Sequence, residues 1–114
     1  MVLDDDDRVR QVAVEALREA GCRVVEAGDG EAALEALLHE PAIRLVITDI
    51  AMPGMTGIQF ARRVQDLPRH IELLFVTGHA DPSDMEGVSE DRLIRKPYPR
   101  RLLLERVRAV LAEA

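Results

Sequence analysis

The chain has 114 residues, 47% hydrophobic and 32% charged, which fits one globular domain with a single core. Its net charge of -6 and three aromatic residues argue against a direct nucleic-acid binder, which needs clustered Lys and Arg and stacking rings. No apolar run reaches the roughly 18 residues of a membrane span, and the start lacks the form of a secretion signal. The one cysteine, Cys22, cannot form an internal disulfide and is predicted to be core, which favours a reducing cytoplasm.

The first part of the chain predicts a strand, a helix and a second strand. Residues 1–3 form a short apolar strand, which favours a domain cut from a longer protein. Asp6 or Asp7 can cap the following helix, and Gly21 suits its end. Residues 22–27 predict the second strand. The helix is expected to bury one stripe at helical spacing: Val9, Val12, Ala13, Ala16, Leu17 and Ala20.

The remainder continues the same alternation. A helix over 31–40 should turn Ala33, Leu34, Leu37 and Leu38 inward and stop at Pro41. Further elements are a strand over 44–48, a helix from 57 to about 67, strands over 71–76 and 92–95, and a closing helix over 99–114. Residues 82–90 are polar and poorly periodic, with room for a short helix. Five strands alternating with crossovers predict an α/β, doubly wound parallel sheet.

Polar residues stand at the ends of four of these strands. They are Asp4 and Asp5, Asp49, Thr77, and Lys96, the single lysine of the chain. In a parallel sheet these ends open on one edge, where ligands bind. Neighbouring carboxylates repel one another unless a cation joins them, and Mg²⁺ accepts one or two carboxylates while keeping water and phosphate oxygens. A phosphoryl group on Asp49 would then meet Mg²⁺, the Thr77 hydroxyl and the Lys96 ammonium.

Each residue also has an ordinary structural interpretation. The acidic run 4–7 can be a solvated helix cap, and Asp49 can form an Asx turn. Thr77-Gly78 is a common strand exit, and Lys96 before Pro97 can be a surface lysine. Their joint placement at four strand ends favours the functional interpretation.

These residues resemble a known family. The whole chain is similar to a response-regulator receiver domain of two-component signalling, of the CheY-like superfamily. The resemblance rests on Asp4-Asp5, on Thr77-Gly78, on Lys96-Pro97, and above all on Asp49 with the following Met52-Pro53-Gly54-Met55-Thr56-Gly57. It implies a flavodoxin-like (βα)5 fold with strand order 2-1-3-4-5, here with a short or irregular fourth helix.

The resemblance also implies the residue roles. Asp49 would accept a phosphoryl group from a histidine kinase or its phosphotransfer domain. Asp5, Asp49 and the Ala51 carbonyl would bind Mg²⁺, with Asp4 acting through water. Thr77 and Lys96 would hold the phosphoryl oxygens, and the Lys96-Pro97 peptide would be cis.

Three features depart from the family pattern. The interval from Thr77 to Lys96 is short, which puts the usual fourth helix and its signalling surface in doubt. The switch aromatic of the fifth strand is replaced by Leu93, although Tyr98 after Lys96-Pro97 fits the family. Ala51 and His79, each two residues beyond a site residue, leave the lifetime of a phosphoryl group open.

The predicted function is a phosphorylation-controlled switch over residues 1–114, a signalling domain rather than an enzyme, with no output domain in this chain. An unknown downstream protein is expected as partner, direct nucleic-acid and membrane binding are not, and a weak homodimer is left open. The alternative is a phosphorylation-independent interaction module on the same fold. A small-molecule phosphohydrolase would need a second acid at Ala51, and a dinucleotide-binding domain would need G-x-G-x-x-G after the first strand. The basic residues of the closing helix can dock a partner or form a solvated face.

Overall fold

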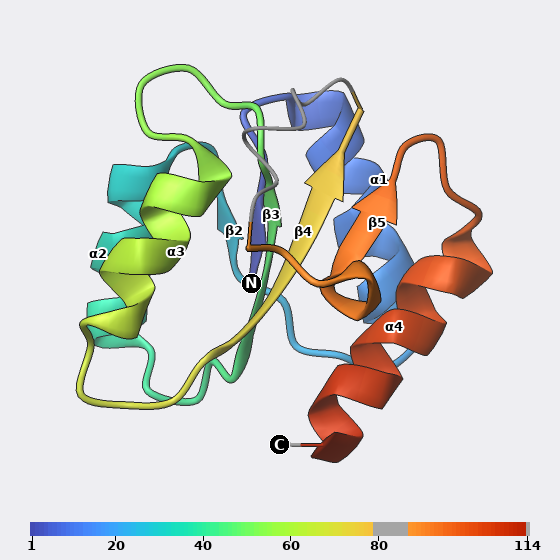
Figure 1. The fold of residues 1–114 in the computed structure, drawn as a ribbon. Helices are drawn as coiled ribbons and strands as arrows, with labels where there is room; N and C mark the ends of the chain where they lie inside the picture. Colours follow the sequence, from blue (N-terminus) through green and yellow to red (C-terminus); the bar gives the residue numbers. More distant parts are fainter. Residues whose placement is uncertain (79–86, 114) are drawn as a thin grey trace.

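The structure is a computed structural model that describes residues 1–78 and 87–113. Its centre is a five-stranded sheet in the order β2-β1-β3-β4-β5, and all paired strands run parallel (Figure 1). The strands are β1 (Val2–Leu3), β2 (Glu26–Ala27), β3 (Leu45–Asp49), β4 (Glu72–Thr77) and β5 (Leu93–Arg95). This confirms the predicted doubly wound fold and its strand order.

Helices cover both faces of the sheet. Figure 1 shows α2 and α3 on one side and α1 and α4 on the other. The helices are α1 (Asp7–Glu19), α2 (Gly30–His39), α3 (Gly57–Gln65) and α4 (Arg100–Glu113). Asp6, Asp29 and Thr56 cap the first three, each accepting a backbone N–H of the first turn. Among residues 1–78 and 87–113, no helix is long and apolar enough to cross a membrane.

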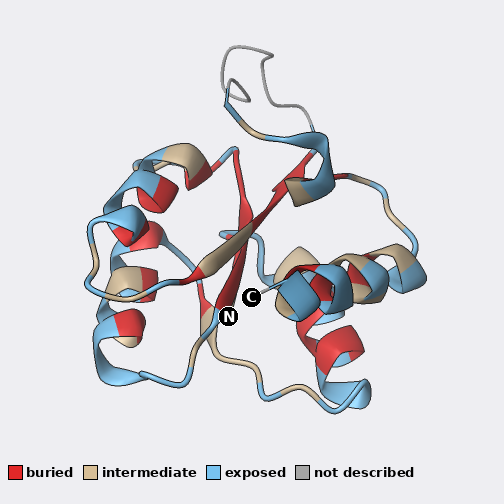
Figure 2. Ribbon diagram, turned by 60° about the horizontal axis from the view of Figure 1, so that its bottom comes forward, coloured by how far each residue is buried: buried red, intermediate tan, exposed pale blue. Residues whose placement is uncertain are grey.

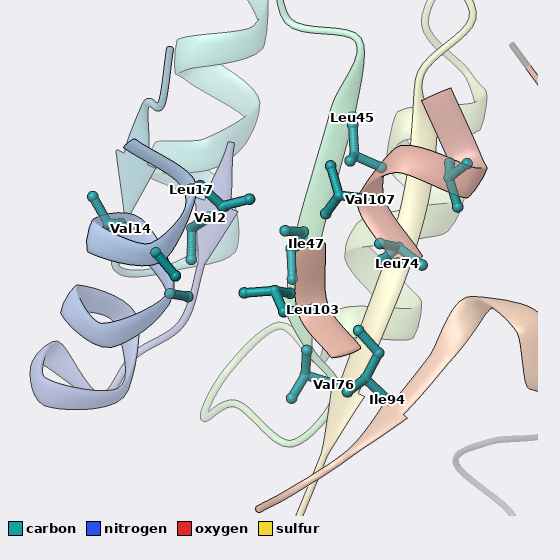
Figure 3. Packing of buried hydrophobic residues seen from close by; sticks show 13 residues of the cluster. Val2, Val14, Leu17, Leu45, Ile47, Leu74, Val76, Ile94, Leu103 and Val107 are labelled. Atoms are coloured by element: carbon teal, nitrogen blue, oxygen red, sulfur yellow. The ribbon is translucent and has the colours of Figure 1, made fainter. Parts of the chain in front are cut away.

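The strands divide their side chains between two core layers. On β3, Leu45 and Ile47 belong to the layer under α1 and α4, while Val46 belongs to the layer under α2 and α3. This alternation follows from the two-residue period of a strand. Figure 3 shows Leu17 of α1 and Leu103 of α4 converging on sheet residues of the first layer. The buried residues therefore lie along the sheet and the inner helix faces (Figure 2).

The second strand is shorter than the sequence predicts. The prediction of 22–27 was wrong at its start, because β2 covers only Glu26–Ala27. β2 is an edge strand whose partner is β1, and β1 offers two residues, Val2 and Leu3, for pairing. Cys22 therefore lies half-buried against the core rather than within it.

Three apolar residues predicted to face the core are exposed instead, and one of them is Ala20 at the end of α1. Val12 of α1 is 66% exposed and Leu38 of α2 is 68% exposed. Each lies about 100° of helix rotation from its buried neighbour, Ala13 or Leu37, which takes it off a narrow stripe. On α1, Val14 occupies the core position that was not predicted.

The fourth-helix region is partly described. Residues 79–86, which include His79 and most of the segment predicted as a short helix, lie outside the described residues. After them the chain forms the 3-10 helix η2 (Glu90–Arg92) and enters β5 directly. Arg92 of η2 is bound to Glu72 of β4, with its Nη1 2.6 Å from Oε2.

Candidate functional site

The strand ends bring the predicted site residues to one edge of the sheet. Asp4 and Asp5 follow β1, Asp49 ends β3, Thr77 ends β4, and Lys96 follows β5. Because all five strands are parallel, these positions share the carboxyl edge. Carboxylate oxygens of Asp4, Asp5 and Asp49 all lie within 4.8 Å of one another.

One ammonium group joins two of the three carboxylates. Lys96 Nζ donates to Asp49 Oδ2 at 2.9 Å and lies 3.5 Å from Asp4 Oδ2. Burial alone would lower the pKa of Lys96, but the hydrogen bond to Asp49 and the charges of both aspartates outweigh it and raise that pKa. Lys96 is therefore protonated at neutral pH, and its charge is directed at the phospho-acceptor candidate.

Asp4 is fixed by its backbone and by its carboxylate. Its N–H donates to the Ala27 carbonyl at 3.2 Å, and its Oδ1 accepts the Asp6 N–H at 2.9 Å. Burial raises the pKa of Asp4, against the opposing effects of the Asp6 N–H and the Lys96 charge, while the nearby Asp49 charge adds to the rise. This carboxylate is held where its negative charge is unfavourable, a common property of functional sites.

The loop after β3 fixes Asp49 from the other side. Asp49 Oδ1 accepts the Ala51 N–H at 3.0 Å, and Ile50 N–H donates to the Val76 carbonyl at 3.0 Å. The chain then returns so closely that Gly57 N–H donates to the Ile50 carbonyl at 2.9 Å. A side-chain carbon on Gly57 would collide with the Asp49 and Ile50 backbone, which explains the glycine physically.

The structure locates Ala51 and Thr77 at the site, and their roles as ligands of the metal and of the phosphoryl group stay predictions. Ala51 is exposed and contributes its amide to Asp49, so its carbonyl as a metal ligand stays a prediction. Thr77 is buried at the strand end, and its carbonyl accepts the Lys96 N–H at 2.8 Å. The Lys96-Pro97 peptide is cis, as the sequence resemblance implied.

Arg10 is a residue near the site that the sequence interpretation missed. Its Nη1 donates to the backbone carbonyl of Asp4 at 2.7 Å. A lone arginine in an amphipathic helix carries no motif, so only spacing from Asp4-Asp5 could have drawn attention to it. Tyr98 was noticed, and it packs against the core with burial raising the pKa of its hydroxyl.

Known proteins agree with this fold. The model of the response regulator receiver domain family matches residues 1–108. The chain is 32% identical to the response regulator receiver protein CpdR of Brucella abortus, covering all of this chain and 97% of CpdR. It is 31% identical to the transcriptional regulatory protein AfsQ1 of Streptomyces coelicolor, of which it spans half the length.

A solved structure shares the architecture over nearly the whole chain. The chemotaxis protein CheY4 of Vibrio cholerae superposes with a TM-score of 0.80 at 29% identity, covering 96% of this chain and 94% of CheY4. Sequence similarity and the shared sheet architecture thus support the same family assignment. The chain belongs to the response regulator receiver domain family of two-component signalling.

Proposed function

We propose that this receiver domain accepts a phosphoryl group on Asp49 in a Mg²⁺-dependent reaction and thereby switches a protein-binding surface. The observation that carries the proposal is the convergence of three carboxylates and one ammonium at a single sheet edge, with Lys96 Nζ 2.9 Å from Asp49 Oδ2. Strand ends separated by up to 92 positions contribute these groups. A fold needs no such concentration of charge, with Asp4 and Asp49 buried, for its own stability.

The proposed chemistry is an in-line displacement at phosphorus. An Asp49 carboxylate oxygen forms a bond to the phosphorus of a phosphohistidine, and the phosphorus–nitrogen bond breaks with its electron pair going to the imidazole. Lys96 neutralises charge on the transferred phosphoryl oxygens, and the Thr77 hydroxyl binds one of them. Later attack by water releases inorganic phosphate and restores the Asp49 carboxylate.

The residues present fit a magnesium ion. Hard carboxylate oxygens are the ligands that Mg²⁺ prefers, and three aspartates offer them within 4.8 Å. Asp5 and Asp49 would hold the ion directly, the Ala51 carbonyl would add a third ligand, and Asp4 would act through water. When bound, Mg²⁺ supplies positive charge to phosphoryl oxygens in the transition state.

The partners follow from this chemistry. A histidine kinase or its phosphotransfer domain supplies the phosphoryl group, and an unidentified downstream protein reads the phosphorylated surface. A domain phosphorylated by such a kinase is expected in the cytoplasm. The domain itself is a switch whose own turnover is limited to phosphorylation and dephosphorylation of Asp49.

Intact-mass spectrometry after incubation with acetyl phosphate tests the proposal. The wild-type protein should gain one phosphoryl group in Mg²⁺ and none in EDTA. Asp49→Asn should gain none under either condition, because the amide removes the nucleophile while keeping the shape. Asp66→Asn, which alters an exposed aspartate at the end of α3, is the matched control and should react like wild type.

The opposite result would favour the phosphorylation-independent module. A folded, Mg²⁺-binding wild-type protein that gains no phosphoryl group with either acetyl phosphate or a phosphorylated phosphotransfer domain contradicts the proposal. A time course from seconds to hours separates this result from fast dephosphorylation. An adduct that persists in Asp49→Asn would assign the acceptor to another residue.

A further inference from the structure

Arg10 of α1 contacts residues of three elements, and one of these residues is Asp4 of the carboxylate cluster. Its Nη1 donates to the Asp4 carbonyl at 2.7 Å, its Nη2 to Asp7 Oδ1 at 2.6 Å, and its Nε to Glu26 Oε1 at 3.1 Å. These acceptors belong to the end of β1, the start of α1, and β2. A single guanidinium group therefore ties the turn that carries Asp4 and Asp5 to the neighbouring strand.

This arrangement differs from an ordinary surface ion pair. The Arg10 side chain is 14% exposed, whereas Arg18, on the same helix and within 3.9 Å of the same Glu26, is 53% exposed. Arg10 uses all three types of guanidinium nitrogen at once, which a lysine ammonium cannot reproduce because its donors share one atom. Exposed ion pairs contribute little to folding stability, but a partly buried guanidinium with three acceptors fixes the geometry of the groups that it joins.

The charge of Arg10 is already matched by its own partners. Asp7 and Glu26 each accept one hydrogen bond from it, so two carboxylates accompany one guanidinium. Its contact with Asp4 is to the backbone carbonyl and not to the carboxylate. The influence of Arg10 on the site must therefore come mainly from the position it gives the Asp4-Asp5 turn.

We propose that Arg10 is a positioning residue for metal binding, holding the β1–α1 turn so that Asp4 and Asp5 face Asp49. The inference rests on the proposed function, since it concerns how this chain presents carboxylates to Mg²⁺. Asp4 Oδ2 faces Lys96. The other atoms of Asp4 are held by Ala27 at its N–H, by Asp6 at its Oδ1 and by Arg10 at its backbone carbonyl. Without the Arg10 side chain, the backbone carbonyl of Asp4 loses the guanidinium group that donates to it.

The test is the Mg²⁺ dissociation constant of the folded protein, followed by ¹H-¹⁵N NMR because the chain has no tryptophan for fluorescence. Arg10→Gln should weaken Mg²⁺ binding about 10-fold, the lower end of the effect of outer-shell partners of metal ligands. The phosphorylation rate with acetyl phosphate should recover to within about twofold of wild type at saturating Mg²⁺, because Asp49 and Lys96 are untouched.

Two further variants separate position from charge and from general stability. Arg10→Lys keeps the charge but not the fork, and should remain at least about threefold weaker than wild type for Mg²⁺. Arg18→Gln is the matched control on the same helix: it removes the donor to the Val24 carbonyl and the 3.9 Å ion pair with Glu26, and it leaves the Arg10 contact with Asp4 in place. Its Mg²⁺ affinity should stay at the wild-type value even where its urea midpoint falls.

Each outcome decides the inference. Unchanged affinity in Arg10→Gln, full recovery in Arg10→Lys, or an equal loss in Arg18→Gln would overturn it. Should Arg10→Gln fail to fold, Arg10→Lys carries the same test. Wild-type protein that binds no Mg²⁺ would overturn the proposed function as well, whereas wild-type binding with an unaffected Arg10→Gln would overturn the role of Arg10 alone.

Discussion

At the scale of single residues, the site concentrates negative charge that the fold does not fully neutralise. Asp4, Asp5 and Asp49 contribute three carboxylates, and Lys96 hydrogen-bonds to two of them. Asp4 and Asp49 are buried, so water screens their repulsion poorly. Functional sites commonly keep such unfavourable groups at the expense of stability.

Replacing Asp4 with asparagine should stabilise the protein at pH 7 without Mg²⁺. Burial raises the pKa of Asp4 above its ordinary 3.8, so the native state favours the protonated carboxyl. The stabilisation by that neutral form is complete below pH 3.8 and is lost as the pH rises through the raised native pKa. The neutral side chain of the Asp4→Asn variant avoids this loss, and Lys96 keeps Asp49 as a partner.

Urea unfolding of both proteins at several pH values measures the effect. The excess free energy of unfolding of Asp4→Asn over wild type should be largest near pH 7 and shrink toward pH 3.8. Asp66→Asn, at an exposed position, is the control for the substitution itself. Equal stability of Asp4→Asn and wild type at all pH values would mean that the Asp4 charge is fully compensated.

At the scale of elements, the connection from β3 to α3 fixes the position of Asp49. The chain leaves β3, passes through a turn and comes back to contact its own start at Gly57. Thr56 and Gln59 then close the first turn of α3 with reciprocal hydrogen bonds of 3.1 and 2.9 Å. The loop is thus held at both ends.

Gly57→Ala should destabilise the protein by about 1–3 kcal/mol, the usual cost of inserting atoms into a packed site. The new Cβ would meet the Asp49 carbonyl and the Ile50 backbone, so Asp49 must move. Gly28→Ala is the control, since its Cβ would make an ordinary 3.5 Å contact with Arg10 Nη1. That variant should be neutral or stabilised by about 0.4–1 kcal/mol through unfolded-state entropy.

Urea unfolding gives both stabilities, and phosphorylation by acetyl phosphate gives the functional effect. Gly57→Ala should also react more slowly than Gly28→Ala because the nucleophile is displaced. Wild-type stability in Gly57→Ala would show that the loop can relax around the added carbon.

The elements also show what the sequence can and cannot predict. A continuous apolar run and the helical spacing of apolar residues are local properties, so the strand ending in Asp49 and the order of helices and strands were predictable. The extent of β2 depends on how much of β1 lies beside it, which is a tertiary property. Val12 and Leu38 were misplaced because helical periodicity defines a stripe but not its width. Arg10 was missed because its acceptors on β1 and β2 meet only in the fold.

At the scale of the whole molecule, folding and assembly of the site are the same event. Asp4 and Lys96 lie 92 positions apart. The four contributing strand ends lie at residues 4–5, 49, 77 and 96, so a helix or a long connection separates each from the next. An unfolded chain therefore has no preformed cluster of these carboxylates. An ion that binds the cluster must favour the folded state.

Mg²⁺ should therefore raise the free energy of unfolding. At an ion concentration of about 100 times the dissociation constant, binding to the native state alone contributes about 2.7 kcal/mol. Urea unfolding with Mg²⁺, compared with EDTA at equal ionic strength, measures this difference. Asp49→Asn should lose most of it because a central carboxylate is gone, while Asp66→Asn should keep it. Equal stabilisation of Asp49→Asn and wild type would place the ion elsewhere on this acidic protein, and the strand-end cluster would no longer account for its binding.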